Sequence, residues 1–497
     1  MSATPRQIRL IITGLMLGML LGALDQTIIS TAMPKVVSDL GGLSLYSWVF
    51  TTYMLCSTTV VPLFGKLADI FGRRLMFLIG LGFFLIGSAL CGLSQNMTEL
   101  IIFRGIQGIG AGALMPISMT IIGDLFPPER RGRMQGLFGA VFGLSSVVGP
   151  AVGGFLVEHL SWHWIFYVNL PFGLVSALFI IAGLKESKSE RKASIDWWGA
   201  ITLTVAIIAI LLGTVFGGGS ANTETAKYDW SSPIVYVLFA AGFVLIGLFI
   251  AIERRVADPI LPLSLFKNRV VTTSNITGFL VGAGMFGAIT YIPLFVQGVI
   301  GESPSRSGYI LTPLMLGLIV SSIIGGRVLS RVTFRTMVLT GLSIVTVGFA
   351  LMTTMNIQTT NVIVILYMII TGIGMGLLMP TFTIAVQSTV AKEVRGVATS
   401  STQFFRSMGG TIGVSIMGAI MSHQLVKLTN PQLLLSTEAR AKLAQQNLLD
   451  PMREELSNAI HHVFITGLVI VALGILFGAM MGSARMKKES VERVIEV

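Results

Sequence analysis

Charged side chains are scarce in this sequence. Only 11% of the 497 residues are Asp, Glu, Lys or Arg, whereas soluble domains carry about 25%. So few charges could not cover a globular surface in water, which argues against soluble enzymes, nucleic-acid binders and disordered regulators. The formal charge of +11 therefore indicates basic loops beside a membrane and not a nucleic-acid partner.

Cysteine and histidine are also rare, with two and five residues. Cys56 and Cys91 both lie in apolar runs, and their spacing fits neither a disulfide framework nor a zinc site. The histidines do not form a metal-binding pattern. A membrane-embedded enzyme would need a cluster of catalytic groups, so we expect no enzymatic activity, no metal and no cofactor.

Long apolar segments dominate what is present, and hydrophobic residues make up 53% of the chain. A membrane-spanning helix needs about 20 mostly apolar residues. By this criterion we predict an all-α membrane protein with fourteen spans, at 10–33, 46–65, 75–94, 99–123, 134–157, 163–184, 198–217, 233–252, 270–297, 306–328, 336–355, 360–388, 401–423 and 460–482.

The basic residues are distributed unevenly between the two sides of these spans. An even number of spans places both termini on one side, and that side holds 25 of the 34 Lys and Arg residues. The other side holds seven. The positive-inside rule therefore predicts a multi-pass protein of the cell membrane with both termini in the cytoplasm.

The sequence also contains a weak internal repeat. GIGAGALMP at 108–116 returns as GIGMGLLMP at 372–380, and Glu129, Arg131 and Gly132 match Glu393, Arg395 and Gly396 at the same offset. Parallel repeats are typical of two-lobed transporters. We therefore expect a six-helix lobe at 1–197, two inserted helices at 198–252, and a second six-helix lobe at 253–497 with a long outer loop at 424–459.

Four motifs make a more specific resemblance. They are LDQTIISTAMP at 24–34, GKLADIFGRR at 65–74, RGIQGIGAG at 104–112 and GLSSVVGPAVGG at 143–154. They resemble the motifs of the major facilitator superfamily, and in particular of its fourteen-helix drug/proton antiporters, the QacA/EmrB-like branch. The resemblance implies the major facilitator fold, with two lobes that rock about a central site.

Asp25 is the one acidic residue well inside a predicted span, and Arg104 begins the fourth span at a matching depth. An intramembrane carboxylate is costly and suggests a function, because it can lose and regain a proton. We expect Asp25 and Arg104 to share an aqueous pocket. The resemblance implies that they serve proton coupling, and the alternative is a structural ion pair.

The loop motif contributes Gly65, Asp69, Gly72, Arg73 and Arg74. By resemblance, Asp69 and Arg73 form a charge network with Asp124 that latches the two lobes on the cytoplasmic side. The alternative is that the arginines only set the topology. In the second lobe Ser330 and Thr333 replace the aspartate and a glycine, so we expect that copy to be a structural relic.

The fifth predicted span carries glycines at close spacing and a proline. Glycine faces allow helices to approach closely, and a proline bends its helix. By resemblance this is the contact that seals one side of the exporter, whereas static packing is the alternative. The motif residues are Gly143, Gly149, Pro150, Gly153 and Gly154.

The resemblance also implies which spans line a substrate cavity. Aromatic and methionine side chains make pockets that tolerate many shapes. Candidates on the spans that line the cavity in this superfamily are Tyr53, Met54, Gln107, Tyr291, Phe295, Gln297, Met315, Phe382 and Gln387. We expect Arg406 to reach lipid headgroups instead, and Ser436 to begin a surface helix in the outer loop.

These features together predict a secondary exporter that exchanges hydrophobic or cationic amphiphilic drugs for protons. We expect a monomer in the lipid bilayer with small-molecule amphiphiles as its partners. The alternatives are a dedicated exporter or importer of one metabolite or lipid, and a tetracycline-type exporter. A single embedded acid makes the second of these less favourable, because a drug–metal chelate carries a divalent ion.

Overall fold

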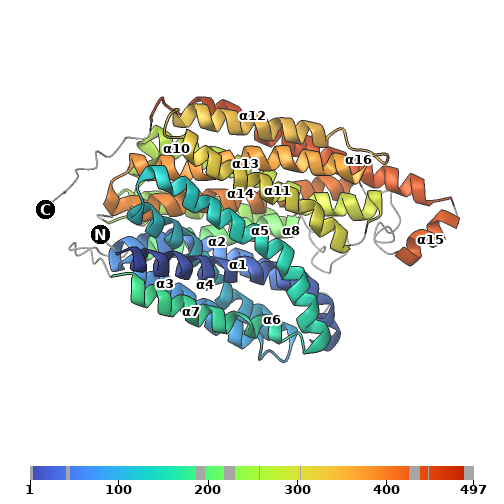
Figure 1. Ribbon diagram of the computed structural model, residues 1–497, viewed down its shortest axis with the longest axis horizontal. Helices are drawn as coiled ribbons and strands as arrows, with labels where there is room; N and C mark the ends of the chain where they lie inside the picture. The colour runs from blue at the N-terminus through green and yellow to red at the C-terminus, as the bar shows by residue number, and fades with distance from the viewer. Residues whose placement is uncertain are drawn as a thin grey trace.

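The computed structural model describes residues 4–40, 45–185, 196–217, 230–256, 258–302, 304–424, 437–445 and 447–485. In these residues it consists of helices and short connections, without a named strand. Figure 1 shows two groups of helices side by side, with both chain ends at the same end of the molecule. We call this end the terminal end and the other the distal end.

The helices follow the chain in three groups. The first lobe contains α1 (Pro5–Leu40), α2 (Tyr46–Phe71), α3 (Arg73–Cys91), α4 (Met97–Leu125), α5 (Pro128–His159), α6 (Trp164–Tyr167) and α7 (Asn169–Gly183). Then come α8 (Trp197–Gly217) and α9 (Pro233–Glu253). The second lobe contains α10 (Arg269–Leu294), the π-helix η4 (Phe295–Ile300), α11 (Pro304–Val328), α12 (Phe334–Met352), α13 (Asn361–Thr389), α14 (Arg395–Gln424), α15 (Thr437–Gln445) and α16 (Leu449–Ala479).

The helices agree with the predicted spans in number and differ in detail. Within the described residues, 13 helical stretches are long and apolar enough to cross a membrane, and the 32-residue α5 occupies the remaining predicted span. The sixth span is interrupted between α6 and α7. The last helix begins at Leu449, so the end of the predicted outer loop is helical. Ser436 lies outside the described residues, and α15 begins at the next position.

The two lobes repeat the same packing. In the first, α1 packs on α5 and α7, and α4 packs on α2 and α3. In the second, α10 packs on α14 and α16, and α13 packs on α11 and α12. The lobes meet through α5 on α11 and α2 on α14. The internal repeat in the sequence thus corresponds to two lobes with matching helix contacts.

The inserted helices lie on one side of the seam between the lobes. Helix α8 packs on α2 and α14, where Ile207 and Leu211 join Val61 and Phe404 in one apolar cluster. Helix α9 packs mainly on α8, and only 17% of its apolar 18-residue stretch is buried. The pair therefore covers the α2–α14 seam with α8 and presents α9 outward.

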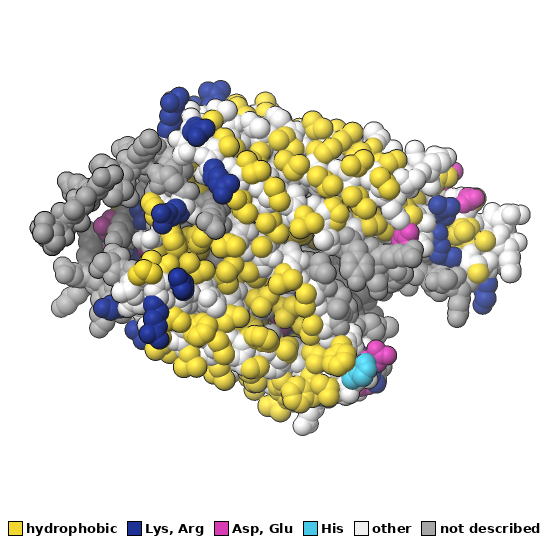
Figure 2. All heavy atoms as spheres, viewed as in Figure 1, with side chains coloured by type: hydrophobic (Ala, Val, Ile, Leu, Met, Phe, Trp, Pro, Cys, Tyr) yellow, Lys and Arg dark blue, Asp and Glu magenta, His cyan; other side chains and the backbone are white. Residues whose placement is uncertain are grey.

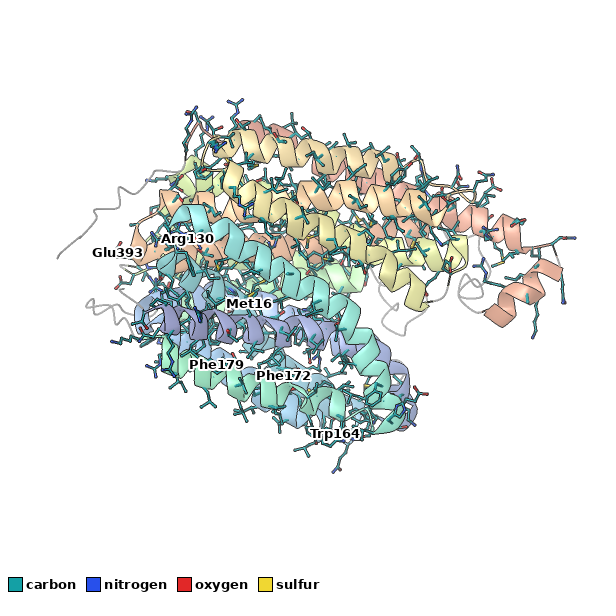
Figure 3. The ribbon with its side chains drawn as sticks, in the orientation of Figure 1. Met16, Arg130, Trp164, Phe172, Phe179 and Glu393 are labelled. Atoms are coloured by element: carbon teal, nitrogen blue, oxygen red, sulfur yellow. The ribbon has the colours of Figure 1, made fainter. Side chains whose placement is uncertain are left out.

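The outer surface suits a bilayer. Figure 2 shows hydrophobic side chains over the middle of one face, with Lys and Arg at its ends, mostly the terminal end. Arg130 and Glu393 lie at the terminal end and Trp164 at the distal end (Figure 3). Trp164 is 47% exposed and Phe172 of α7 42%. Tryptophan at the edge of an apolar band is typical of a membrane interface.

This arrangement makes the orientation testable with single cysteines in a variant that lacks Cys56 and Cys91. Lys442 on α15 and Arg255 after α9 are both exposed and lie on opposite sides of the predicted membrane. In intact cells we expect an impermeant maleimide to label Lys442→Cys and to miss Arg255→Cys. Permeabilised cells are the control, in which both should react. The reverse pattern in intact cells would contradict the predicted orientation.

Candidate functional site: a buried ion pair, a lobe contact and a central cavity

Asp25 of α1 and Arg104 of α4 form an ion pair inside the first lobe. Arg104 Nη1 lies 2.5 Å from Asp25 Oδ2, and the two side chains are 2% and 1% exposed. Gln107, one turn along α4, donates from Nε2 to Asp25 Oδ1 at 2.8 Å and accepts from Arg104 Nη1 at 2.8 Å. The carboxylate therefore has a full charge and a neutral amide as partners.

Two further polar side chains complete this cluster. Asn169, at the start of α7, donates from Nδ2 to Asp25 Oδ1 at 3.4 Å and to Ser88 Oγ at 3.0 Å. Ser88 of α3 donates in turn to the carbonyl of Phe166 at 2.9 Å. Four helices thus supply hydrogen bonds around Asp25. Neither Ser88 nor Asn169 was predicted, although both are polar residues at apolar positions of their spans.

Tyr53 of α2 separates the ion pair from the middle of the protein. The guanidinium carbon of Arg104 lies 4.0 Å from the centre of the Tyr53 ring, a cation–π contact. Tyr53 lines the central cavity, whereas Asp25 and Arg104 do not. The predicted aqueous pocket is therefore wrong in one respect: the two residues meet directly in a closed cluster behind Tyr53.

The terminal end of the seam is held by Asp69 of α2. Its carboxylate accepts hydrogen bonds from the backbone N–H groups of Gly396 and Val397, at 3.1 and 2.9 Å. Both belong to the first turn of α14 in the other lobe, where unpaired N–H groups and the helix dipole favour an anion. Asp69 thus caps a helix of the opposite lobe.

Three more charges surround this contact. Arg73 pairs with Asp69 at 2.6 Å and with Asp124 at 3.2 Å, and Asp124 also pairs with Arg395 of the second lobe at 3.0 Å. Arg73, Asp124 and Arg395 side chains are each 16% exposed. We call Asp69, Arg73, Asp124, Arg395 and the α14 amides the latch cluster. The internal repeat aligns Arg395 with Arg131, but the sequence alone predicts no role for Arg395.

The two glycines of the loop motif are each required by a different local constraint. A Cβ at Gly65 would collide with the Ser400 side chain, so glycine permits the approach of α2 to α14. Gly72 adopts φ +98° between α2 and α3, a conformation that favours glycine. Arg74 is not part of the latch cluster, because the described residues give it no ion pair. In the second lobe, the Ser330 and Thr333 side chains make hydrogen bonds to neighbours three residues away, and the backbone at Thr333 forms an isolated β-bridge with Arg485.

The glycines of α5 face two different helices. A Cβ on Gly143 would lie 3.2 Å from Met315 Cβ of α11, and Gly136 and Gly139 face the same helix. Gly149 instead faces Thr27 of α1 within the first lobe. The motif is therefore divided between a lobe contact and internal packing. Gly153 is buried, and a Cβ on Gly154 would meet no atom within 4 Å. The side chain of Pro150 is not among those that the structure describes.

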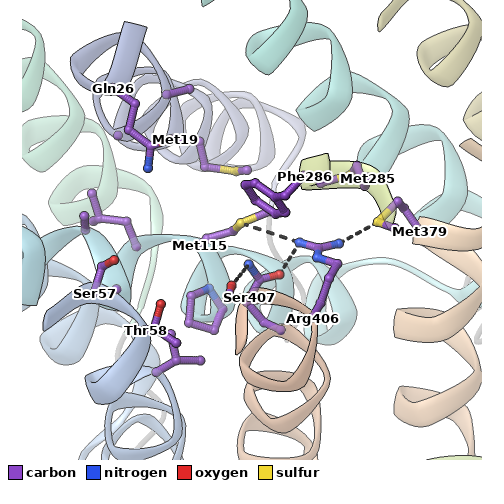
Figure 4. Close-up of a pocket in the computed structure, with 18 of the residues that line it drawn as sticks. Met19, Gln26, Ser57, Thr58, Met115, Met285, Phe286, Met379, Arg406 and Ser407 are labelled. Atoms are coloured by element: carbon purple, nitrogen blue, oxygen red, sulfur yellow. Dashed lines mark hydrogen bonds between the residues drawn. The ribbon is translucent and has the colours of Figure 1, made fainter. Parts of the chain in front are cut away.

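A cavity of about 360 Å³ lies between the lobes, and both lobes line it. The first lobe contributes Met19, Gln26, Ser57 and Met115, and the second contributes Met285, Phe286, Met379 and Ser407 (Figure 4). Met54 of the first lobe and Met315 of the second also line it. Its volume falls within the range of small-molecule sites, and methionine side chains adapt to ligands of different shape. Of the nine predicted cavity residues, Tyr53, Met54 and Met315 are present.

The other six predicted cavity residues lie elsewhere. Gln107 belongs to the ion-pair cluster, and Gln387 donates across the seam to the Met119 carbonyl at 3.1 Å. Tyr291, Phe295 and Phe382 are buried in the core of the second lobe, and Gln297 lies in the π-helix η4. Apolar spans give no periodic signal for which face meets the cavity, so these assignments were wrong.

Arg406 of α14 is the main residue that the sequence reading misplaced. We expected it at the lipid headgroups, but it lines the cavity between the two lobes. Its guanidinium donates to Gln403 Oε1 and to the sulfur atoms of Met379 and Met115 (Figure 4). The predicted span begins at residue 401, which places Arg406 near the membrane interface. Helix α14 instead begins at Arg395, six residues before the predicted start, so Arg406 lies deeper in the helix.

The chain is similar to known transporters along nearly its whole length. It is 42% identical to the multidrug transporter protein MdtP of Bacillus subtilis (strain 168), over 97% of this chain and 94% of that protein. It is 40% identical to multidrug resistance protein 3 of the same organism, over 96% of each. It is also 31% identical to the MFS-type efflux pump MFS1 of Trichophyton rubrum, over 98% of this chain and 93% of that protein.

Structure and family comparison agree with these relatives. The crystal structure of the human organic anion transporter MFSD10 (TETRAN) matches with a TM-score of 0.62 at 15% identity, over 94% of this chain and 100% of that chain, which shows a shared fold. The family model of the Major Facilitator Superfamily matches residues 15–414. The chain therefore belongs to the Major Facilitator Superfamily, whose members are multi-pass membrane transporters and not enzymes.

Proposed function

We propose that this transporter is a proton-coupled exporter of structurally diverse hydrophobic and amphiphilic drugs. The observation that carries the proposal is the buried Asp25–Arg104 pair, which lies one aromatic ring away from a cavity shared by both lobes. The relatives named as a multidrug transporter, a multidrug resistance protein and an efflux pump support the substrate class and the outward direction.

The cavity supports a broad substrate range. Seven methionine side chains line it, and each has a flexible, polarisable thioether that can repack around different ligands. Neutral hydrogen-bonding groups such as Gln26, Ser57 and Ser407 lie among them. A site for one polar metabolite would instead need several fixed polar contacts that match that metabolite.

The ion pair supplies a route to proton coupling. A proton on Asp25 would cancel its charge and release Arg104, whereas a substrate pressed against Tyr53 would keep Arg104 on the carboxylate. Protonation and substrate occupancy of the cavity therefore oppose each other. Exchange of a drug for protons requires that the two ligands compete for the same protein. Each must bind one conformation more tightly than the other, because a ligand shifts a conformational equilibrium only through this difference in affinity.

The latch cluster supports alternating access. It joins the lobes at the terminal end, while the lobes diverge toward the distal end (Figure 1). With the termini in the cytoplasm, this conformation is closed to the cytoplasm. Arg73, Asp124 and Arg395 are each 16% exposed, so water can reach these charges when the lobes separate, which makes the pairs easier to break than a fully buried pair. We propose that the protein works as a monomer in the cell membrane.

The first test concerns Asp25. Asp25→Asn removes the titratable group at nearly constant size, so efflux driven by a pH gradient should fall to background in proteoliposomes. Substrate exchange without a gradient should persist, because it needs no proton release. Asp25→Glu should retain part of the activity with a shifted pH optimum. Asp39→Asn is the matched control, since it removes an exposed carboxylate from the same helix.

Stability must be separated from coupling in this test. Loss of one partner leaves Arg104 buried and uncompensated, which costs about 3–5 kcal/mol in folding free energy. The double variant Asp25→Asn/Arg104→Gln removes both charges and should recover thermal stability without recovering gradient-driven efflux. Full gradient-driven efflux in either Asp25→Asn variant would show that another group carries the proton.

The second test concerns the latch cluster. Asp69→Asn replaces one acceptor oxygen by an amide that cannot accept from the α14 N–H groups. A hydrogen bond to a charged group contributes about 1.5–3 kcal/mol, so the closed conformation should lose roughly tenfold or more in population. We expect turnover to fall while the Kd for substrate, measured on purified protein, stays within about twofold.

Arg74→Gln is the control for this variant, because Arg74 adjoins Arg73 but makes no ion pair within the described residues. It should transport at nearly the native rate once matched for membrane level. If Asp69→Asn transports as fast as Arg74→Gln, the latch assignment is incorrect.

A further inference from the structure

The cavity carries a positive charge without a negative one. Among the described residues that line it, Arg406 is the one charged side chain, and none is Asp or Glu. A pocket for cations would be expected to hold a carboxylate or a cluster of aromatic faces. The positive charge of the lining therefore disfavours the cationic substrates that the sequence predicts.

The partners of Arg406 leave its charge uncompensated. Its Nη2 donates to the neutral amide oxygen of Gln403, and the other described acceptors are thioether sulfurs of Met379 and Met115. Sulfur is a weak acceptor, and a guanidinium has five N–H donors. By contrast, Arg104 in the first lobe has the Asp25 carboxylate at 2.5 Å.

An unpaired cation surrounded by apolar side chains is unfavourable, and arginine cannot remove the problem by losing its proton. Its planar fork is suited to two parallel hydrogen bonds with a carboxylate or a similar oxyanion. A ligand anion in the cavity would thus supply the missing counter-ion. The sulfur atoms that now accept from Arg406 are weak competitors for such a ligand.

The rest of the lining defines the other part of the ligand. Met19, Met285 and Phe286 face the same space as Arg406 (Figure 4). They offer apolar, adaptable contacts for a hydrophobic body of drug size. Met115 comes from the first lobe and Met379 from the second, so an anion bound at Arg406 would lie where the lobes meet.

We infer that the charged substrates of this transporter are amphiphilic organic anions, whose carboxylate binds Arg406 while the apolar body packs on the methionines and Phe286. This inference rests on the proposed export function and names its substrate class. Neutral hydrophobic compounds remain substrates, because the same apolar lining accepts them. Hydrophobic cations bind more weakly than matched anions, since Arg406 repels them.

The test uses three probes with one apolar body: dansyl-undecanoic acid, its methyl ester and the corresponding dansyl amine. Binding to the full-length protein in nanodiscs is followed by fluorescence polarisation, with empty nanodiscs as the blank. We expect the acid to bind native protein roughly tenfold more tightly than the ester, as for a charge-assisted hydrogen bond. The amine should bind more weakly than the ester.

Variants of Arg406 assign the effect. Arg406→Gln should bring the Kd of the acid close to that of the ester measured on the same variant. Arg406→Lys keeps the charge and should retain part of the preference, which guards against a folding defect in the first variant. Arg74→Gln, a charge change outside the cavity, should behave as the native protein.

Equal binding of acid and ester by native protein overturns the inference, as does tighter binding of the amine or no binding of the acid. An acid preference that survives Arg406→Gln also overturns it. Gradient-driven efflux of the neutral ester from proteoliposomes decides the proposed function separately. Efflux of the ester without an acid preference would leave the exporter assignment standing and remove only the anion assignment.

Discussion

A charge enclosed by apolar helices is stable only where an opposite charge or hydrogen bonds replace its lost water. This constraint organises the protein. Asp25 and Arg104 satisfy it within the first lobe, where α4 and α7 direct polar groups onto the carboxylate. Asp69 satisfies it only across the seam, on amides of the other lobe. Among the described residues Arg406 has only a neutral amide oxygen and two thioether sulfurs as acceptors, and we infer that a ligand anion supplies its counter-ion.

The placement of these charges explains how the lobes could act together. Charges paired within one lobe move together with that lobe. The latch cluster joins residues of both lobes, so its contacts have to break when the lobes move apart at the terminal end. The glycines at 65, 136, 139 and 143 bring helices of opposite lobes close together, so the contact between the lobes depends on close packing as well as charge. Tyr53 contacts Arg104 of the ion pair and also lines the cavity. It can therefore couple protonation of Asp25 to the presence of a ligand in the cavity.

The sequence predicted the spans, the repeat and the pairing of Asp25 with Arg104 and of Asp69 and Asp124 with Arg73, because intramembrane charges and glycine motifs stand out against an apolar background. It did not predict which side chains face the cavity. Gln107, Gln387 and Phe382 lie on spans that are apolar on most faces, so only tertiary packing decides that Gln107 meets Asp25, Gln387 crosses the seam and Phe382 enters a core. Arg406 was misplaced because its helix extends further toward the terminal end than its apolar run.

The central claim is that Asp25 and a substrate in the cavity compete through Tyr53 and Arg104. Proton release on ligand binding measures this directly. Purified protein in weakly buffered detergent, titrated with a neutral hydrophobic ligand over a series of pH values, should release protons on binding at those pH values where Asp25 is protonated in the free protein. The double variant Asp25→Asn/Arg104→Gln should bind the same ligand and release none. Equal proton release by native protein and double variant, or none by native protein at any pH where it binds, would contradict the account.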